Sequence, residues 1–212
     1  MTKRIIYSLS VILFFFQTGF AQSDSQADKI VSDVLNSVNT TAFKTNFKLD
    51  IRDKANNQNQ STSGTITIKG SKFYIDMMDM KAWYNGKTQW AFIPQNNEVS
   101  ITEPTEKELS ETNPIAILSG FKTKSFIRFS KKKSNEYYII EMIPKVKTSD
   151  ILNIEIQVNK NTHILVSIKL TAKKGNTTLL TLNNFQKNIK VTDNYFVFNA
   201  SKYTGVIEND LR

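Results

Sequence analysis

The sequence contains no cysteine, a single histidine, and no long apolar run beyond its first residues. Without cysteine the chain has no disulfide, no thiolate metal site and no cysteine nucleophile. A transmembrane helix needs about 20 consecutive apolar residues, and no segment after residue 21 reaches that length. His163 lies on the polar side of a predicted strand, without carboxylate neighbours at ligand spacing. We therefore expect no membrane-spanning helix, no bound metal and no cofactor.

The N-terminal segment has the features of a secretory signal peptide. Lys3 and Arg4 precede a nearly unbroken apolar run from Ile5 to Phe16, and Gly19-Phe20-Ala21 has the small-x-small form of a cleavage site. We predict a signal peptide over residues 1–21 and a mature chain over residues 22–212. Gln22 follows the predicted cleavage site, so the mature N-terminus offers no thiol for lipid attachment.

The mature chain has the length of one domain and a basic surface. Residues 22–212 fall in the range of about 100–200 residues that is common for single domains. Removing Lys3 and Arg4 leaves 26 basic and 19 acidic residues, a net charge of +7. That charge permits attraction to anionic partners but is also typical of a solubilising surface. We expect an exported, soluble protein that does not bind nucleic acid.

One amphipathic helix opens the mature chain. Its apolar residues recur at spacings of three and four, which places them on one face: Ala27, Ile30, Val31, Val34, Leu35 and Val38. Ser25 and Asp28 resemble a capping box, with Asp in place of the usual Glu or Gln. The pattern predicts that this helix begins near Ser25.

After the helix, the hydrophobic period changes to two, which is typical of strands with one wet face. Asn85-Gly86 predicts a hairpin with a type I′ turn, and residues 56–61 predict a polar loop. Strands are predicted over residues 43–51, 65–68, 73–77, 82–84, 88–93, 98–102, 137–143, 154–158, 164–170, 179–182 and 195–198. We predict an α+β fold that is mostly β: a large curved antiparallel sheet, unclosed, of about eleven strands with two or three helices.

The middle of the chain breaks this pattern. Residues 105–112 are polar and compatible with a helix, and Asn113-Pro114 predicts the start of a second helix over residues 115–118, which Gly120 would end. A basic patch follows, made of Lys122, Lys124, Arg128, Lys131, Lys132 and Lys133. The patch is either a docking surface or a solvated loop.

No motif predicts catalysis. The segment Gly86-Lys87-Thr88 ends like a phosphate-binding loop, but the required first glycine is replaced by Lys81. There is no G-x-S-x-G motif, and the acidic pairs lie in polar stretches where nothing suggests burial that would raise a pKa. We expect no catalytic residue and a protein that is not an enzyme.

The predicted inward positions of the first sheet half carry no charge. They are Phe47, Leu49, Ile51, Ile66, Ile68, Phe73, Ile75, Met77, Trp90, Phe92, Val99 and Ile101. Such a face either packs into a filled core or, because few helices are predicted to cover so many strands, lines an apolar cavity. Met77, Met78 and Met80 would add flexible, polarizable side chains to such a cavity.

The chain resembles the LolA-type periplasmic outer-membrane lipoprotein carriers. The resemblance rests on the paired segments Gly64–Lys69 and Lys72–Ile75, on Tyr84–Trp90, which is close to the family's Asp-Gly-Lys-Thr-x-Trp hairpin, and on the helix after Asn113-Pro114. The ending, from Asn184 to Asn188 and from Phe196 to Val206, fits in order as well. Each motif is weak alone, but their order covers nearly the whole mature chain.

The resemblance implies a half-barrel of about eleven strands with three lid helices that hold acyl chains between them. The implied lipid-binding residues are Phe47, Leu49, Ile66, Ile68, Phe73, Ile75, Met77, Trp90, Phe92 and Ile101. The implied lid residues are Ile30, Val34, Leu35, Ile115 and Leu118. The implied partners are acylated lipoproteins, an inner-membrane ABC lipoprotein-release complex and an outer-membrane acceptor, between which the protein would ferry its cargo.

One departure from the family and three alternatives stay open. The family often has an Arg-Pro pair that latches the lid after the second strand, where this chain has Gly70-Ser71. We therefore expect a lid that opens more easily, or a different cargo, unless Lys69 or Lys72 replaces the latch. The alternatives are a carrier of a free lipid or other apolar small molecule such as a pigment intermediate, an envelope-stress sensory half-barrel, and an unrecognised hydrolase.

Overall fold

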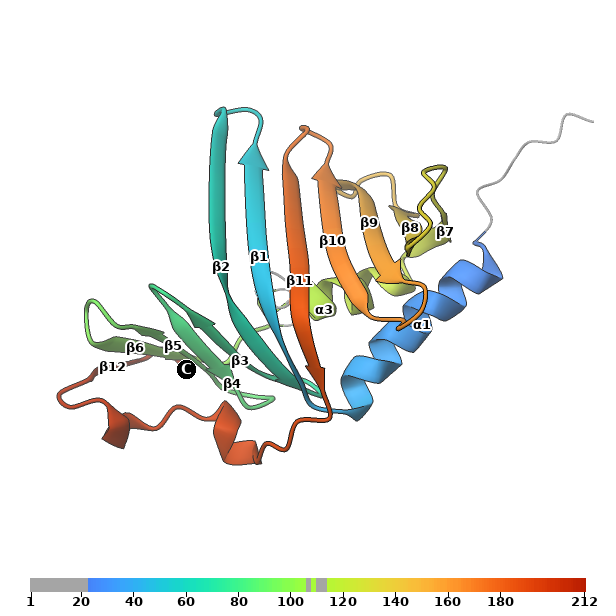
Figure 1. The fold of residues 1–212 in the computed structure, drawn as a ribbon. Coiled ribbons are helices and arrows are strands. Elements are labelled where there is room, and N and C mark those ends of the chain that lie inside the picture. The colour runs from blue at the N-terminus through green and yellow to red at the C-terminus, as the bar shows by residue number, and fades with distance from the viewer. Residues whose placement is uncertain (1–22, 106–107, 110–113) are drawn as a thin grey trace, which may run out of the picture.

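The computed structural model describes residues 23–105, 108–109 and 114–212, and one curved antiparallel sheet dominates it (Figure 1). Twelve strands follow the order β12-β6-β5-β4-β3-β2-β1-β11-β10-β9-β8-β7, so the sheet is unclosed and ends at β12 and β7. The predicted α+β, mostly β class is confirmed, with one strand more than expected. The strands are β1 (Phe43–Asp53), β2 (Gln58–Lys69), β3 (Lys72–Met77), β4 (Lys81–Tyr84), β5 (Gln89–Ile93), β6 (Glu98–Thr102), β7 (Ser125–Phe129), β8 (Tyr137–Pro144), β9 (Ile151–Asn159), β10 (Leu165–Ala172), β11 (Thr177–Lys187) and β12 (Ile207–Asp210).

Two meanders make up the sheet. Strands β2 to β6 pair consecutively, as do β7 to β11, and β1 joins the two series by pairing with both β2 and β11. All these pairs are antiparallel, whereas β12 lies parallel to β6 at one edge. The short connections that the sequence indicated are therefore present in both series.

The sheet bends within β2 (Figure 1), and Gly64 is the residue at which the pairing of β2 with β3 ends. β3 pairs with β2 only from Gly64 to Lys69, and the longer strands continue past this point (Figure 1). A Cβ atom on Gly64 would lie 2.3 Å from the carbonyl oxygen of Asp76 in β3, a distance that real Cβ atoms essentially never show. Glycine therefore allows the close approach of the two backbones where β3 to β6 turn away from the long strands.

Helix α1 (Ser25–Thr40) packs its apolar stripe into the core of the concave side. Its N-cap is Asp24, whose carboxylate accepts hydrogen bonds from the backbone amides of Gln26 and Ala27. The predicted capping box at Ser25 and Asp28 is thus wrong, because the preceding aspartate satisfies the free amides. The amide of Asp24 also donates to the carbonyl of Ile127 in β7 at 2.7 Å, so the start of the helix is attached to the sheet edge.

Helix α3 (Pro114–Lys122) lies on the same side and is longer than the sequence predicted. It continues through Gly120, whose Cβ position is open space and whose φ is not positive, instead of ending there. Lys122 in its last turn forms an ion pair with Asp28 of α1 at 3.4 Å. The predicted helical stretch at residues 105–112 lies mostly outside the described residues, so the third helix stays a prediction.

Several strand boundaries differ from the prediction. β2 includes residues 58–61, which were expected to form a loop, because their register with β1 continues without a shift. β7 and β12 were not predicted at all. Residues 195–198, predicted as a strand, overlap the 3-10 helix η1 (Asp193–Phe196).

The Asn85-Gly86 hairpin is present, but its turn is not type I′. Tyr84 pairs with Gln89, which leaves a four-residue loop, and only Gly86 of the two central residues has a positive φ, at 101°. The side-chain oxygen of Asn85 accepts hydrogen bonds from the amides of Lys87 and Thr88. This side chain closes the loop, as Asn side chains commonly do in turns.

The C-terminal segment, residues 188–212, covers the convex side of β3 to β6 (Figure 1). It contains η1, η2 (Ala200–Lys202) and β12. Asp193 forms ion pairs with Lys69 at 3.2 Å and with Lys72 at 2.8 Å. Under it lies a second apolar cluster, which we call the convex cluster: Trp83, Phe92, Val99 and Phe198, with Tyr74, Trp90, Ala200, Tyr203 and Val206 against them.

Candidate functional site

The concave side of the sheet is not completely filled. A cavity of about 460 Å³ lies between the sheet and α3. Its lining is almost entirely apolar: Phe47, Leu49, Ile51, Thr62, Ile66, Phe73, Ile75, Met77, Met80, Ala82, Gln89, Ala91, Ile117, Ile168, Leu170, Thr178, Leu180 and Leu182. The lining contains no Asp, Glu, Lys, Arg or His as far as the described residues show. The site can therefore hold an apolar group but offers no acid, base or charged anchor for it.

One part of the cavity wall is deeply buried, and another part is more exposed to solvent. Ile66, Phe73 and Leu180 are almost fully buried in the core, whereas Met77 and Met80 are only partly buried. Among the other lining residues, Ile51 is 39% exposed. Methionine has a flexible thioether chain, so the more exposed part of the wall can adapt to ligands of different shape.

One polar atom in the wall lacks a partner. The side-chain oxygen of Gln89 is buried and accepts no hydrogen bond from the described residues. An unpaired buried acceptor costs about 1–3 kcal/mol, so a donor group on a ligand would be favoured near it.

The structure brings six of the ten predicted lipid-binding residues together around this cavity. These are Phe47, Leu49, Ile66, Phe73, Ile75 and Met77. Ile68 is buried in the same core but does not line the cavity. That the six contact a lipid stays a proposal.

Trp90, Phe92 and Ile101 lie on the opposite, convex side, so their predicted placement in the cavity is wrong. Register explains it: Ile75 pairs with Ala82, and Ala82 pairs with Ala91, so small alanines face the cavity on β4 and β5. The alternate residues of β5, Trp90 and Phe92, face the convex cluster, and Ile101 pairs with Trp90. Both faces of these strands are apolar, so alternation alone could not say which face is concave.

The sequence did not predict the part of the lining that comes from the other meander. Ile168 and Leu170 of β10, and Thr178, Leu180 and Leu182 of β11, which pairs with β1, line the cavity. The alternating apolar residues of these strands were a usable signal, because the period of two marks one buried face.

The predicted lid residues divide between the two helices. Ile30, Val34 and Leu35 of α1 and Leu118 of α3 are buried in the concave core, and the side chain of Ile115 lies outside the described residues. Among the described side chains, Ile117 is the residue of α3 that lines the cavity, and none from α1 does so. Helix α3 therefore covers the cavity directly, while α1 packs beside it and holds Lys122.

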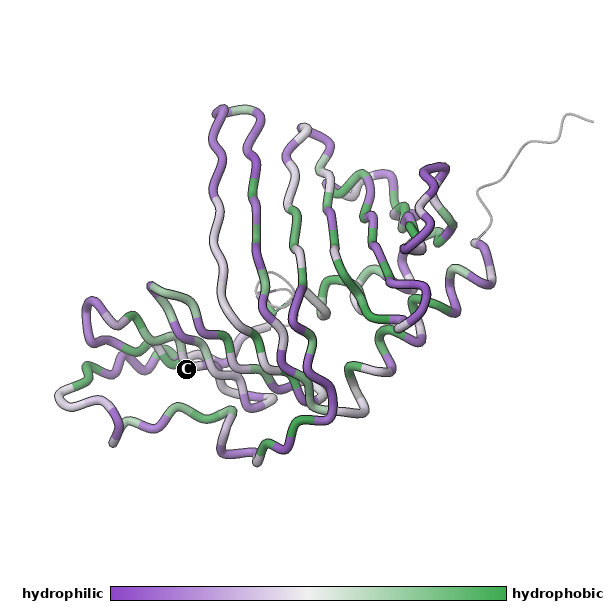
Figure 2. Tube along the Cα trace, viewed as in Figure 1, coloured by the Kyte–Doolittle hydropathy of each residue, from purple (hydrophilic) through white to green (hydrophobic). Residues whose placement is uncertain are grey.

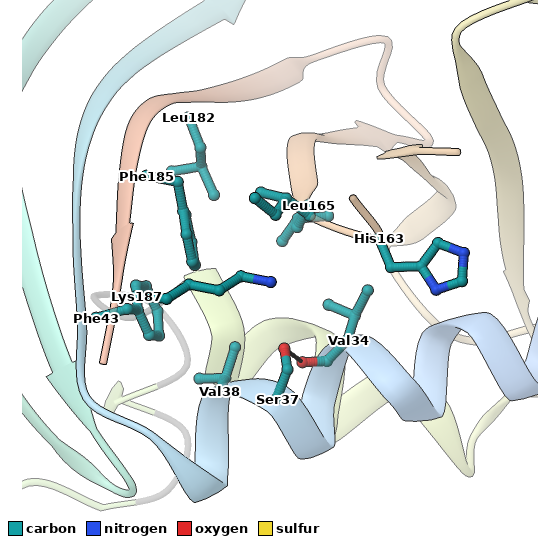
Figure 3. Close-up of a pocket in the computed structure, with 10 residues that line it drawn as sticks. Val34, Ser37, Val38, Phe43, His163, Leu165, Leu182, Phe185 and Lys187 are labelled. Atoms are coloured by element: carbon teal, nitrogen blue, oxygen red, sulfur yellow. Dashed lines mark hydrogen bonds between the residues drawn. The ribbon is translucent and has the colours of Figure 1, made fainter. Parts of the chain in front are cut away.

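A second hollow lies between α1 and the ends of β10 and β11 (Figure 3). Its volume is only about 10 Å³, which is no more than the space needed for one water molecule. Val34, Ser37 and Val38 approach it from α1, and the hydroxyl of Ser37 donates to the carbonyl of Val34 at 2.8 Å. It is a packing gap, and His163 at its border is not part of a larger site.

Neither candidate for a replacement latch contacts the lid. Lys69 and Lys72 flank Gly70-Ser71, and both pair with Asp193 on the C-terminal segment. The only ion pair between α1 and α3 in the described part of the chain is the one between Lys122 and Asp28. An easily opened lid therefore stays a prediction, with this single partly exposed pair to hold the helices together.

Half of the six residues of the basic patch are neutralised by ion pairs within the protein. Lys122 pairs with Asp28, Arg128 with Glu141 at 3.1 Å, and Lys132 with Glu155 at 2.6 Å. Lys124, Lys131 and Lys133 have no ion pair among the described residues. A docking role for this patch would depend on those three exposed side chains.

The described residues contain neither a cluster of His, Cys, Asp or Glu able to hold a metal ion nor a helix long and apolar enough to cross a membrane. The most perturbed pKa among them belongs to Tyr74, whose pKa is raised by burial and by the nearby Asp76 carboxylate, to which its hydroxyl donates at 3.0 Å. Tyr74 belongs to the convex cluster, so this shift does not concern the cavity.

Comparison with known proteins agrees with the geometry. A family model described as "Outer membrane lipoprotein carrier protein LolA" matches residues 17–175. No curated protein matches significantly in sequence.

Solved structures share the fold at low identity. An uncharacterized conserved protein from Thermus thermophilus is similar with a TM-score of 0.58 and 8% identity, over 87% of this chain and 99% of that one. A LolA superfamily protein from Nitrosomonas europaea gives a TM-score of 0.41 and 11% identity, over 81% of this chain and 97% of that one. The first likeness shows the fold alone, and the second is too distant to carry an argument.

Proposed function

Because the chain belongs to the family of the outer membrane lipoprotein carrier LolA, we propose that it is a periplasmic carrier that holds the acyl chains of lipoproteins in its concave cavity. The observation that carries this proposal is the apolar cavity of about 460 Å³ under α3. Its volume lies within the roughly 300–1,000 Å³ of ligand pockets. Its lining lacks charge, which suits a hydrocarbon chain and no ionic ligand.

The physical need for such a carrier follows from the cost of exposing hydrocarbon to water. Each buried CH₂ contributes about 0.8 kcal/mol, so an acylated protein leaves a membrane only if its chains are shielded at once. Residues 1–21 would direct export, and residues 22–212 would form the single carrier domain. The protein would act as a monomer that takes cargo from an inner-membrane ABC release complex and delivers it to an outer-membrane acceptor.

A carrier of a free lipid or another apolar small molecule is the second candidate. It is favoured by the size of the cavity, which lies in the lower part of the range for single small ligands. A cargo with several acyl chains would need α3 to move away from the sheet. Both candidates use the same cavity, so one blocking substitution tests them together.

Ala91→Trp provides that test, because Ala91 lies in the cavity wall and an indole there would occupy the space of the ligand. We expect the affinity for a fluorescent fatty acid, measured by titration, to fall at least tenfold. Ala55→Trp is the matched control, since Ala55 is exposed in the loop between β1 and β2. If Ala91→Trp binds the probe as the unaltered protein does, the cavity is not the binding site.

A further inference from the structure

The outer part of β2 has an unpaired edge. β1 pairs with β2 from Gln58 to Ile68, but β3 pairs with β2 only from Gly64 onward. In the part of the chain that the structure describes, no strand pairs with the other edge of residues 58–63. In Figure 1 this end of β2 lies beside β1 and extends beyond β3.

This edge lacks the features that usually protect a strand edge from pairing. Exposed edges are commonly blunted by lysine, proline or a bulge. Residues 58–63 read Gln-Asn-Gln-Ser-Thr-Ser, with no charge and no proline, and their register with β1 has no shift. In Figure 2 this part of β2 is hydrophilic to neutral throughout, so it exposes main-chain groups without an apolar surface.

The sheet edge formed by β7, in contrast, is covered by hydrogen bonds with residues 23 and 24. There the amide of Asp24 donates to the carbonyl of Ile127, and the amide of Ile127 donates to the hydroxyl of Ser23 at 3.1 Å. Within the described residues, Ser23 and Asp24 thus cover the edge at β7, whereas the edge of β2 stays open.

The register identifies which residues point their main-chain groups outward. Lys69 and Lys72 flank a two-residue turn, so they form the hydrogen-bonded pair that closes the β2–β3 hairpin. Alternate residues of an antiparallel strand point to the same neighbour. Counting back from Lys69 in steps of two places the N–H and C=O groups of Ser63, Ser61 and Asn59 on the open side.

The open edge borders the mouth of the cavity. Thr62 lines the cavity from within this segment, and its hydroxyl lies 3.8 Å from the sulfur of Met77 across the gap between β2 and β3. Ile51, directly across the β1–β2 ladder from Gln60, also lines the cavity and is partly exposed. A chain that leaves the cavity here passes the open edge.

We propose that residues 58–63 of β2 bind the extended peptide segment next to the acylated end of a cargo protein, by adding it to the sheet as a strand. The proposal rests on the carrier function proposed above and assigns its ligand to acylated polypeptides, not free lipids. Main-chain hydrogen bonds would supply affinity without regard to sequence, as in other cases of strand addition. A carrier of many cargoes needs that property.

The test uses the mature protein, palmitate and four lipopeptides. The first lipopeptide is a palmitoylated hexapeptide of uncharged residues. Because a strand can present either side, two further lipopeptides have alternate amides N-methylated in one register or the other, which removes the donors on one side, and the doubly methylated probe is N-methylated in both registers. We expect the doubly methylated probe to bind at least tenfold more weakly than the unmethylated one, and palmitate alone to bind the same cavity more weakly than the lipopeptide.

A variant provides the second arm. Ser61→Pro removes one outward N–H, whereas Ser61→Ala keeps it. We expect Ser61→Pro to lower lipopeptide affinity about tenfold and to leave palmitate affinity unchanged, while Ser61→Ala changes neither. Circular dichroism checks that Ser61→Pro keeps its fold; if it does not, the N-methylated probes on the unaltered protein decide the question.

Four results would overturn the proposal. Equal affinity for methylated and unmethylated lipopeptides would show that main-chain bonds are not used. A dimer in light scattering that Ser61→Pro dissociates would assign the edge to a second copy of the chain. If neither palmitate nor the lipopeptide binds, the proposed carrier function fails as well. If both bind with equal affinity, the carrier function stands and only the proposal of strand addition fails.

Discussion

The two sides of strands β3 to β5 are both apolar, yet one is filled and the other is hollow. On the convex side, aromatic rings pack closely: the ring centroids of Phe92 and Tyr203 are 4.3 Å apart, and those of Phe198 and Tyr203 are 5.1 Å apart. On the concave side, Ala82 and Ala91 leave space, and α3 covers it with Ile117. The element that covers a strand face, more than the apolarity of that face, therefore decides whether a core or a cavity forms.

The covering elements also differ in how they are attached. The C-terminal segment is held by β12 on β6 and by Asp193 on two lysines. Between the two concave-side helices the described residues show one ion pair, between Lys122 and Asp28. A closed core needs a fixed cover, whereas a carrier needs a cover that can move.

The largest expected effect is on the filled side. Phe198→Ala removes a buried ring from the convex cluster and should lower the free energy of unfolding by about 3–5 kcal/mol, because the tightly packed rings cannot close the space. Chemical denaturation measures it. Met78→Ala, at a 94% exposed position, is the control and should change stability by less than about 0.5 kcal/mol. A loss of only about 1 kcal/mol in the free energy of unfolding of Phe198→Ala would mean that the convex side is packed as loosely as the concave side.

A smaller loss is expected on the hollow side. Leu118 of α3 is fully buried, and Leu118→Ala should lower the free energy of unfolding by about 2–3 kcal/mol. This is near the lower end for such changes, because residues that line the adjacent cavity can relax into the vacated space. The same variant should release a bound fatty acid faster, since α3 loses its main anchor. Stopped-flow displacement of the fluorescent probe measures this rate. An unchanged rate would show that α3 does not gate the cavity.

Two glycines give a matched pair of opposite sign. Gly64→Ala would place a Cβ against the carbonyl of Asp76 and should destabilise the protein by about 1–3 kcal/mol. Gly120→Ala lies in α3 with open space around it and should stabilise the helix by up to about 1 kcal/mol. Thermal unfolding of the two variants separates the signs. If Gly64→Ala were neutral, the bend that opens the mouth would not depend on this close contact.

The smallest effect concerns the attachment of the C-terminal segment. Hydrogen bonds from Lys72 and then from Lys69 lower the pKa of Asp193 below its usual 3.8. A lowered folded-state pKa gives stabilisation that is present above pH 3.8 and is lost as the pH falls through the folded-state value. Asp193→Asn should remove that acid dependence and increase amide exchange in residues 193–206 near neutral pH. Exchange equal to the unaltered protein would show that β12 alone holds the segment.

The sequence predicted the parts of the fold that follow a single hydrophobic period. The helix of Ile30 and Val34, and β1 and β6, were visible because one face is apolar and the other polar. β5 was assigned to the wrong face, because Trp90 and Phe92 are covered by a C-terminal segment whose position no local pattern reveals. β12 was missed because its parallel pairing with β6 joins residues far apart in the chain, such as Ile207 and Glu98. The cavity could not be predicted for the first of these reasons, since its space depends on Ala82 and Ala91 being the residues of β4 and β5 that face the concave side.

Native mass spectrometry of the exported protein, purified without detergent from a periplasmic extract, tests the central claim most directly. We expect the protein to carry acylated adducts and Ala91→Trp, expressed at the same level and folded, to carry none. A protein found without any lipid or acylated peptide, or adducts retained equally by Ala91→Trp, would contradict the claim that the concave cavity holds acyl chains.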